Sequence, residues 1–376
     1  MFGVKKMLTE DKVKAALSKV MDPDLNVDVV SLGMISAIKI EAKKVSFTLT
    51  LTTPACPVKE KLEQECKDAV LALEGVEEVD MISTATVAGQ RKTEKQEIPG
   101  VKQIIAVTSG KGGVGKSTVS CNLAVALSKL GAKVGILDAD ITGPNVPLMM
   151  GVESYEPQAK DNRIVPAMNH GVKVISMAFF VSQDTPLIWR GPMLDKAIKQ
   201  FLRDVEWGEL DYLIVDMPPG TGDAQLSMVQ STDMAGGVIV TTPQDVALLD
   251  GRKGLSMFKQ MNVPILGFVE NMSYFQPKGS SEQFEIFGRG GGKRLAEEMK
   301  VPFLGEIPLD PEVRIGGDNG EPITAKDPDC QVSQAFINIA KQVAAQISIS
   351  SLNRATEAAA AQAAEAAQTN AAPAAV

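Results

Sequence analysis

The stretch SGKGGVGKST, residues 109–118, constrains the fold of this chain more than any other segment. It follows the apolar run QIIAVT and precedes the helix-like segment TVSCNLAVALSKLG, so it lies in a turn between a strand and a helix. Gly110, Gly115, Lys116 and Ser117 match the pattern G-x-x-x-x-G-K-[ST] of a phosphate-binding loop. The alternative is a glycine-rich turn that matches by chance, and the strand-loop-helix setting disfavours it.

The residue types of this loop suit a nucleotide polyphosphate. Glycines let backbone N–H groups point at the phosphates, and the helix that begins here adds the positive end of its dipole. Lys116 is expected to reach the β and γ phosphates, and the Ser117 hydroxyl to bind Mg²⁺. The residues predicted to contact the nucleotide here are Gly110, Lys111, Gly112, Gly113, Val114, Gly115, Lys116, Ser117 and Thr118.

Apolar runs that alternate with helical stretches indicate the fold around this loop. Between residues 101 and 348 they read QIIAVT, KVGILD, VKVISM, YLIVDM, GVIVTT and PILGFVE. Continuous apolar runs are typical of strands buried on both faces, so we expect an α/β fold with a mostly parallel sheet flanked by helices. Ligands of such sheets lie at the carboxyl ends of the strands.

Three further zones flank or precede this domain. Residues 7–88 predict a small α+β domain, in which two helices and strand-like segments alternate. The polar, charged segment 89–100 ends in Pro99 and Gly100 and predicts a linker. Residues 349–376 are alanine-rich and of low complexity, which predicts a disordered tail or a transient helix.

Charge and cysteine content exclude several classes of protein. The net charge of −8 disfavours a general nucleic-acid binder, because affinity for the phosphate backbone needs a basic surface. No run of 18 apolar residues occurs, and the first residues lack the pattern of a signal peptide, so we expect no membrane partner. Four cysteines in 376 residues make no disulfide framework. The sequence therefore predicts a cytoplasmic protein.

Acids at strand ends extend the predicted site. Asp216 closes the run YLIVD, where it would approach Mg²⁺ through water. Asp138 and Asp140 end another strand, and their spacing of two places both carboxylates on one side. One of them is a candidate to assist the metal, and Asp140 a candidate to orient the attacking water. Helix caps or turn formers are the alternative for each acid.

A family resemblance rests on these motifs together. KGGVGKST, DADITGPN and YLIVDMPPGTGD resemble the deviant Walker A ATPases, the class of MinD, ParA and the nitrogenase iron protein. RGPM at 190–193, VENMSYF at 269–275, FGRGGG at 287–292 and GGDNGEPI at 316–323 are similar to the Mrp/ApbC subgroup of iron-sulfur cluster carriers. The first domain, with TTPACP at 52–57, resembles the small iron-sulfur-assembly domain of many bacterial members.

The resemblance implies roles for two more residues. In the class, an additional lysine crosses a homodimer interface and contacts the phosphates of the partner's ATP, which implies a catalytic role for Lys111 beside Lys116 and Asp140. A second cation there would stabilise charge that develops at the γ phosphate. Asn271 resembles the asparagine that reads adenine, since an amide offers a donor and an acceptor, and its alternative is a turn residue.

The sequence departs from the subgroup at the cluster ligands. Many members carry a C-x-x-C pair soon after NMSYF, where two chains hold a bridging cluster, but this chain has no cysteine between 122 and 329. Either another thiol substitutes, or the cluster binds weakly, or the carrier role is lost. Cys56, at the start of an expected helix, is the leading candidate, because the dipole would lower its pKa. Cys66 and Cys121 are expected to be structural, and so is Cys330, for which a role as a second ligand after dimerisation is the alternative.

Three functions remain open on the sequence. The favoured one is an ATP- and Mg²⁺-dependent homodimeric ATPase that carries iron-sulfur clusters to apoproteins. The second is a positioning switch of the MinD or ParA kind, and the acidic chain with a tail free of Lys and Arg after Arg354 speaks against its membrane or DNA partner. The third is an adaptor in which ATP acts as a conformational latch.

Overall fold

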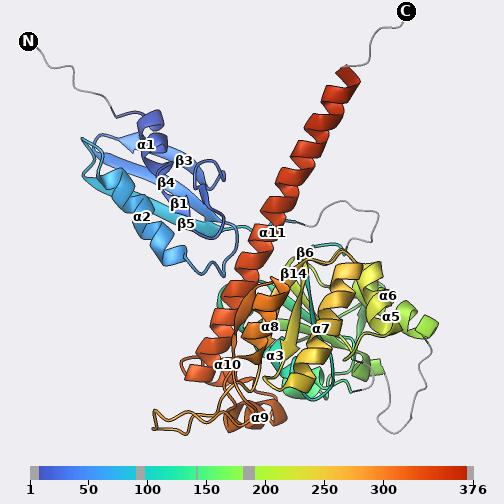
Figure 1. Ribbon diagram of the computed structural model, residues 1–376. Helices are drawn as coiled ribbons and strands as arrows, with labels where there is room; N and C mark the ends of the chain where they lie inside the picture. The colour runs from blue at the N-terminus through green and yellow to red at the C-terminus, as the bar shows by residue number, and fades with distance from the viewer. Residues whose placement is uncertain (1–7, 90–97, 141–142, 181–190, 371–376) are drawn as a thin grey trace, which may run out of the picture. The chain divides into compact units, whose positions relative to one another are not determined.

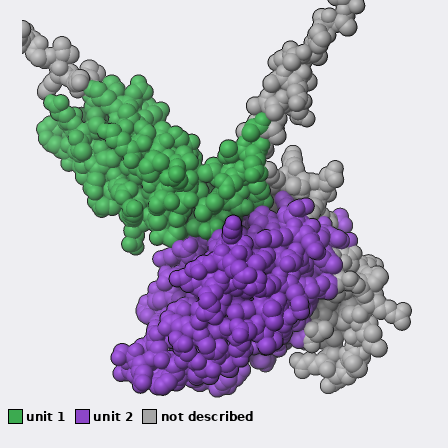
Figure 2. Space-filling model, viewed as in Figure 1, with its two compact units in different colours: residues 1–88, 345–376 green, residues 89–344 purple. Residues whose placement is uncertain are grey.

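The computed structural model describes residues 8–89, 98–140, 143–180 and 191–370 (Figure 1). Within these ranges, the side chains of 191–196, 223–224, 227, 358–359 and 361–370 are outside the description. The chain divides into two compact units, one of residues 1–88 and 345–376 and one of residues 89–344 (Figure 2). Most of the expected linker, residues 90–97, lies outside the described residues.

The first unit contains a three-stranded sheet with two helices. Strands β3 (Ile35–Glu41) and β4 (Lys44–Leu51) pair antiparallel, and β5 (Glu78–Ala85) pairs parallel to β4. Every second residue of β4 is buried, which is the period of a strand with one covered face. Helices α1 (Glu10–Leu17) and α2 (Lys59–Leu71) supply further residues to this core, and β1 (Met21–Asp22) and β2 (Val27–Asp28) form a short hairpin. The expected small α+β domain has this architecture.

The second unit is built on an eight-stranded sheet of order β10-β11-β7-β12-β6-β13-β14-β15. All neighbours pair parallel except β10, which is antiparallel to β11 at the edge. The predicted mostly parallel sheet is therefore confirmed. Its strands are β6 (Val101–Ser109), β7 (Val134–Asp138), β10 (Ala167–Asn169), β11 (Val172–Ser176), β12 (Leu210–Asp216), β13 (Gly236–Thr241), β14 (Ile265–Glu270) and β15 (Phe303–Glu306); β8 (Ala159–Lys160) and β9 (Arg163–Ile164) pair separately.

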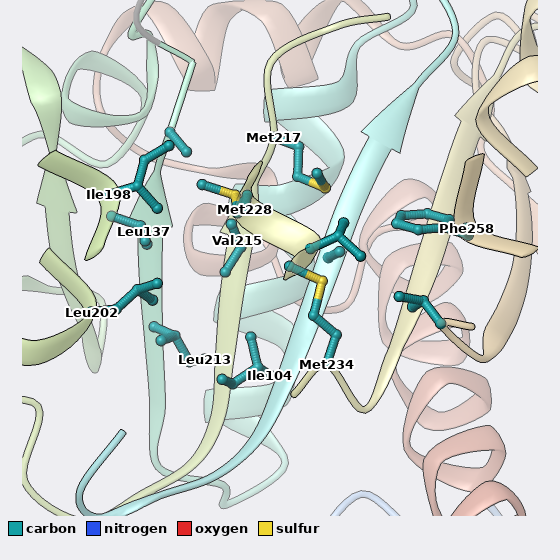
Figure 3. Close-up of a cluster of buried hydrophobic side chains, with 14 of the residues drawn as sticks. Ile104, Leu137, Ile198, Leu202, Leu213, Val215, Met217, Met228, Met234 and Phe258 are labelled. Carbon is teal, nitrogen blue, oxygen red and sulfur yellow. The ribbon is translucent and has the colours of Figure 1, made fainter. Parts of the chain in front are cut away.

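Side-chain alternation along β12 decides which residues meet which helices. Leu213, Val215 and Met217 point into one hydrophobic cluster (Figure 3). That cluster also takes residues from α5 (Gly191–Asp204), α6 (Asp223–Ser231), α7 (Asp245–Gln260) and α8 (Gly291–Met299). Because successive side chains of a strand point to opposite faces, Asp216 lies on the other face. Helix α3 (Lys116–Lys129), which contacts β6, β7 and β12, covers that face.

Shorter helices surround α3. Helix α4 (Val146–Met149) packs on α3 and on α9 (Pro311–Asp318), and α10 (Ile323–Lys326) packs on both α3 and α9. The Asn122 amide oxygen of α3 accepts the backbone N–H and the hydroxyl of Thr324, at 3.1 and 3.0 Å. This buried link ties the helix after the phosphate-binding loop to the C-terminal part of the domain.

The last helix decides between the two expectations for the tail, disorder or a transient helix. Helix α11 is continuous from Gln331 to Asn370, so the expected boundary at residue 348 falls inside it, and the tail is helical as far as Asn370. The reason is composition, since alanine has the highest helix propensity and no proline or glycine occurs between 331 and 370. None of the described helices has the length and apolar character needed to cross a membrane.

Candidate functional site

The loop between β6 and α3 has a shape that only glycine allows at two positions. Gly115 precedes α3 with φ of 83°, and a Cβ there would stand 2.2 Å from Nδ2 of Asn271. A Cβ on Gly110 would stand 2.1 Å from the carbonyl carbon of Asp250. The glycines thus serve close packing of the loop against α7 and against the residue that follows β14. The loop is held as a preformed turn at the carboxyl end of the sheet.

Lys116 lies at the centre of the site as a buried cation. Its side chain is 6% exposed, and its ammonium group donates to Oδ2 of Asp216 at 2.7 Å. Oδ2 of Asp140 lies 3.7 Å away, and Asp216 is completely buried. A buried carboxylate is stable only with charge and hydrogen-bond partners, so Lys116 and Asp216 depend on each other.

Two serine hydroxyls of α3 complete the hydrogen bonding of Asp216. Ser117 donates to Oδ2 and Ser120 donates to Oδ1, each at 2.6 Å. Hydroxyl and carboxylate oxygens are the ligands that Mg²⁺ prefers, and it binds few protein groups beside phosphates and water. The donor set of Ser117 and Asp216 therefore fits Mg²⁺ beside a bound polyphosphate.

The two acids after β7 lie in different surroundings. Asp138 is completely buried and accepts from the Asp140 backbone N–H, the Val146 backbone N–H and the Ser176 hydroxyl. Burial, followed by the nearby Asp216 charge, raises the pKa of Asp138 to about 8. Asp140 instead lines the cavity of the loop. Of this pair, Asp138 organises the turn after β7, and Asp140 faces the space where a ligand would lie.

Two neighbouring cavities extend from the loop. The first has a volume of about 180 Å³, and the second, of about 230 Å³, shares Thr118 and Met149 with it. Asn271 lines the second cavity and donates its Nδ2 to the Val114 carbonyl at 2.9 Å. The first cavity is lined by Ser109, Gly112, Gly113, Gly115, Lys116, Ser117, Thr118, Asp140, Asn145, Met149 and Pro219. The first cavity, with Lys116, Ser117 and Asp140 in its wall, suits a phosphate chain, and the more apolar one beside it suits a base.

Lys111 differs from Lys116 in its burial and in its contacts. Its side chain is half-buried, and its ammonium group makes no hydrogen bond or ion pair with any other residue in the described ranges. Ser109 and Gly112 line the first cavity, whereas Lys111 does not. The Lys111 backbone carbonyl accepts from the Ser109 hydroxyl at 2.9 Å, so the loop fixes the backbone of this residue.

The structure contradicts the expected low pKa of the Cys56 thiol. Cys56 is 9% exposed within the core of the small domain, and burial, with a smaller contribution from Asp22, raises its pKa to about 11. Helix α2 begins only at Lys59, so the single favourable hydrogen bond, from the Val58 backbone, is outweighed. Burial also raises the pKa of Cys66 to about 11. Among the described residues, no three His, Cys, Asp or Glu side chains are grouped to hold a metal.

Two other segments of the second unit make contacts within the fold. The motif FGRGGG carries the start of α8, where Gly290 and Gly292 donate backbone N–H groups to the completely buried carboxylate of Glu270. These hydrogen bonds hold the end of β14 in place, so the glycines of the motif have a structural role. His170, the single histidine of the chain, contacts the Gly320 carbonyl through Nε2 at 2.8 Å.

Comparison with known proteins identifies the family of the chain. Residues 100–344 match the family described as NUBPL iron-transfer P-loop NTPase, and residues 10–81 match the family of iron-sulfur cluster assembly proteins. The chain belongs to the NUBPL iron-transfer P-loop NTPase family. The expected resemblance to iron-sulfur cluster carriers of the deviant Walker A class, with a small assembly-type domain in front, is confirmed.

Relatives of this NUBPL-family chain match over most of their length. An iron-sulfur cluster carrier protein of Synechocystis is 51% identical, over 92% of this chain and all of that one. The iron-sulfur cluster transfer protein NUBPL of Dictyostelium discoideum is 47% identical, over 69% of this chain and 81% of that one. A nucleotide-binding protein of Archaeoglobus fulgidus, solved with ADP, has a TM-score of 0.56 at 38% identity, covering 64% of this chain and 93% of its own.

The NUBPL-type site also contains residues that the sequence pattern did not indicate. Ser120 was missed, although its spacing of four from Lys116 places both on one face of α3. Asn145 and Pro219 lie within the motifs DADITGPN and YLIVDMPPGTGD but were given no role of their own, and no motif contains Met149. Ile141 and Thr142 of DADITGPN and Arg190 of RGPM lie outside the described residues, as do the side chains of 191–193.

Proposed function

We propose that this chain binds and hydrolyses ATP with Mg²⁺ and uses the cycle to carry iron-sulfur clusters to apoproteins. The observation that carries the proposal is the preformed loop around Lys116, Ser117 and Asp216, with two cavities leading from it. Membership of an iron-transfer NTPase family, and relatives named as cluster carriers, supply the cargo. The same findings favour carriage over a positioning switch or an adaptor.

The residues of the loop would act in sequence when nucleotide arrives. Lys116 would leave Oδ2 of Asp216 for the β and γ phosphates, since a triphosphate offers it more negative charge. Ser117 and Asp216 would then hold Mg²⁺, which neutralises charge on the phosphate oxygens. Asp140, at the cavity wall, would orient the attacking water, and Asn271 with the wall of the second cavity would bind the base. Backbone N–H groups of Gly112, Gly113 and Gly115 would hold the remaining oxygens.

Lys111 supports a homodimer as the active form. Its charge lies beside the loop but outside the cavity that the same loop encloses. A second copy placed loop to loop would let each Lys111 reach the other's γ phosphate, as an arginine finger does in trans. Hydrolysis would then require the dimer, and release of the cargo would follow its separation.

The cluster is cargo, and the thiols of one chain do not suffice to hold it. Three of the four cysteines are buried, and Cys330 is the one that solvent partly reaches. Thiolates are the usual ligands of iron-sulfur clusters. We infer that thiols of two chains, or of chain and client, share the cluster, with Cys330 the accessible donor and Cys56 available after local opening. All four thiols are free, which fits a reducing compartment and supports the cytoplasm as the location.

The deciding experiment is anaerobic reconstitution with iron and sulfide. Iron and sulfide bound per chain and visible absorbance are measured for wild type, Cys56→Ser, Cys330→Ser and, as a matched control, the core variant Cys121→Ser. Transfer is then followed as activation of an apo iron-sulfur enzyme with and without Mg-ATP. Cluster-dependent absorbance that Cys121→Ser retains, and transfer stimulated by Mg-ATP, are the expected results. A colourless wild type that still binds ATP would refute the carrier role and leave the nucleotide site standing.

A further inference from the structure

The Ser120 hydroxyl makes a short hydrogen bond to the strand-end carboxylate, and no sequence motif assigns it a role. It lies 2.6 Å from Oδ1 of Asp216 and 3.1 Å from the Lys116 carbonyl, and its residue is completely buried. A hydroxyl has a single hydrogen, and the nearer, charged oxygen is the stronger acceptor. The proton therefore lies toward Asp216, and the contact with the helix carbonyl is secondary.

The two oxygens of Asp216 have different partners. Oδ2 accepts from Lys116 and Ser117, the two groups that a nucleotide with its metal would draw away. Oδ1 accepts from Ser120, which lies behind the loop and outside the lining of either cavity. If Lys116 and Ser117 left Oδ2 for a nucleotide and its metal, the Ser120 bond would be the contact that keeps the carboxylate from rotating.

We propose that Ser120 is a positioning residue for the magnesium site: it holds Oδ1 of Asp216 so that Oδ2 faces the metal when Lys116 has moved to the nucleotide. The inference rests on the proposed Mg-ATP function and adds a residue to it. Helix geometry makes the arrangement possible, because positions 116, 117 and 120 of α3 share the side that faces β12. Removal of the hydroxyl would leave Oδ1 buried without a donor and free the carboxylate to turn.

The test measures metal affinity directly, with Mn²⁺ as the probe and its free concentration followed by electron paramagnetic resonance. Full-length wild type, Ser120→Ala and Ser120→Thr are titrated with Mn²⁺ in the presence of ADP. The control is Ser333→Ala, which also removes a completely buried hydroxyl, one bound to the Ile323 carbonyl at 3.0 Å. A second titration measures ADP affinity in EDTA, and thermal melting shows that each variant is folded.

The expected pattern separates positioning from packing. Ser120→Ala should weaken Mn²⁺ binding about tenfold, because a hydrogen bond to a charged group is lost at the ligand. Ser120→Thr should keep near wild-type affinity, and if its extra methyl prevents folding, Ser120→Cys, a weak donor of similar size, should fall between wild type and alanine. ADP affinity in EDTA should stay within about twofold throughout, since Ser120 touches no phosphate.

Two different results would contradict the inference. Equal Mn²⁺ affinities for Ser120→Ala and Ser333→Ala, with normal ADP binding, would overturn the role of Ser120 alone. A wild-type chain without ADP affinity would overturn the proposed nucleotide function, and this inference with it.

Discussion

The nucleotide loop and the Cys56 corner of the small domain both place a titratable side chain near the start of a helix, yet their chemistry differs. At the loop, the buried carboxylate of Asp216 receives hydrogen bonds from Lys116, Ser117 and Ser120. At the corner, Cys56 lies among apolar side chains, with Asp22 and Asp24 as its acidic neighbours. Burial acts on both groups, but only Asp216 is hydrogen-bonded to a cation, and at Cys56 the charge of Lys59 lowers the pKa less than burial raises it.

The difference shows that a helix start is not sufficient to stabilise an anion. A dipole contributes at most about 2 kcal/mol in favourable partly buried geometries, whereas desolvation can shift a pKa by several units. At Asp216, a cation and two hydroxyls in direct contact offset the cost of burial, whereas at Cys56 the Val58 backbone N–H and the charge of Lys59 do not. In the proposed site Asp216 would therefore be the group that binds metal, while Cys56 stays a protonated thiol.

The largest effect is expected for Lys116→Ala. Loss of the cation removes charge-assisted bonds to two phosphates, so ADP and ATP affinity should fall about a thousandfold. Isothermal titration calorimetry measures this, with Lys129→Ala as the control, an exposed lysine at the other end of α3. The variant should also melt earlier, because Asp216 keeps its burial without its partner. Unchanged ADP affinity in a folded variant would place the phosphates elsewhere.

Lys111→Ala should leave ADP affinity within about twofold and lower turnover about a hundredfold, since one stabiliser of developing charge is lost. Mixing two variants tests whether Lys111 acts across the dimer interface. A dimer of one Lys111→Ala and one Lys116→Ala chain contains one loop with Lys116 that faces the Lys111 of the other chain. Mixed variants should regain steady-state phosphate release that neither shows alone, and no gain on mixing would argue for a role within one chain.

The thiol comparison predicts a pH profile for Cys56. With a pKa of about 11, its thiolate fraction at pH 8 is about a hundredfold below that of an ordinary thiol, and higher nucleophilicity of the thiolate reduces this to roughly tenfold in alkylation rate. Peptide mass spectrometry after iodoacetamide pulses, native against urea-unfolded chain, measures it. The native rate should climb beyond pH 9, and levelling near pH 9 would show a solvated thiol.

The stability of the small domain should depend on pH for the same reason. Because the folded pKa of Cys56 and of Cys66 lies above the unfolded value, the folded state retains protons that the unfolded state loses. Their contribution is complete below about pH 9 and decreases as pH rises toward 11. Urea melts of Cys66→Ala should show a shallower fall across this window than wild type.

The smallest effect is expected for Gly110→Ala, with Gly112→Ala as its control. Gly110→Ala places a methyl group 2.1 Å from the Asp250 carbonyl carbon, whereas Gly112 has open space around it and an ordinary φ. Gly110→Ala should lower the melting temperature by about 5 °C through overpacking, and Gly112→Ala by less than about 1 °C. Equal shifts in calorimetry would mean that α7 does not abut the loop in solution.

Local patterns were sufficient for much of the fold. The buried strands of the large sheet were predicted by continuous apolar runs, and the confirmed P-loop architecture followed from the spacing within residues 109–118. The alanine-rich tail supported two predictions, because low complexity indicates disorder while high helix propensity indicates a helix. In the structure the helix extends to Asn370.

By itself, the sequence determined the class of fold, the nucleotide loop with its two lysines, and the strand-end acids, because each depends on residues close together in the chain. Only the tertiary structure decided how those groups pair: that Asp138 is buried in a turn while Asp140 lines the cavity, that Ser120 binds the far oxygen of Asp216, and that Cys56 is a buried thiol. The physical reason is that burial and hydrogen-bond partners come from segments distant in sequence, and these set the charge of a side chain more strongly than its neighbours along the chain.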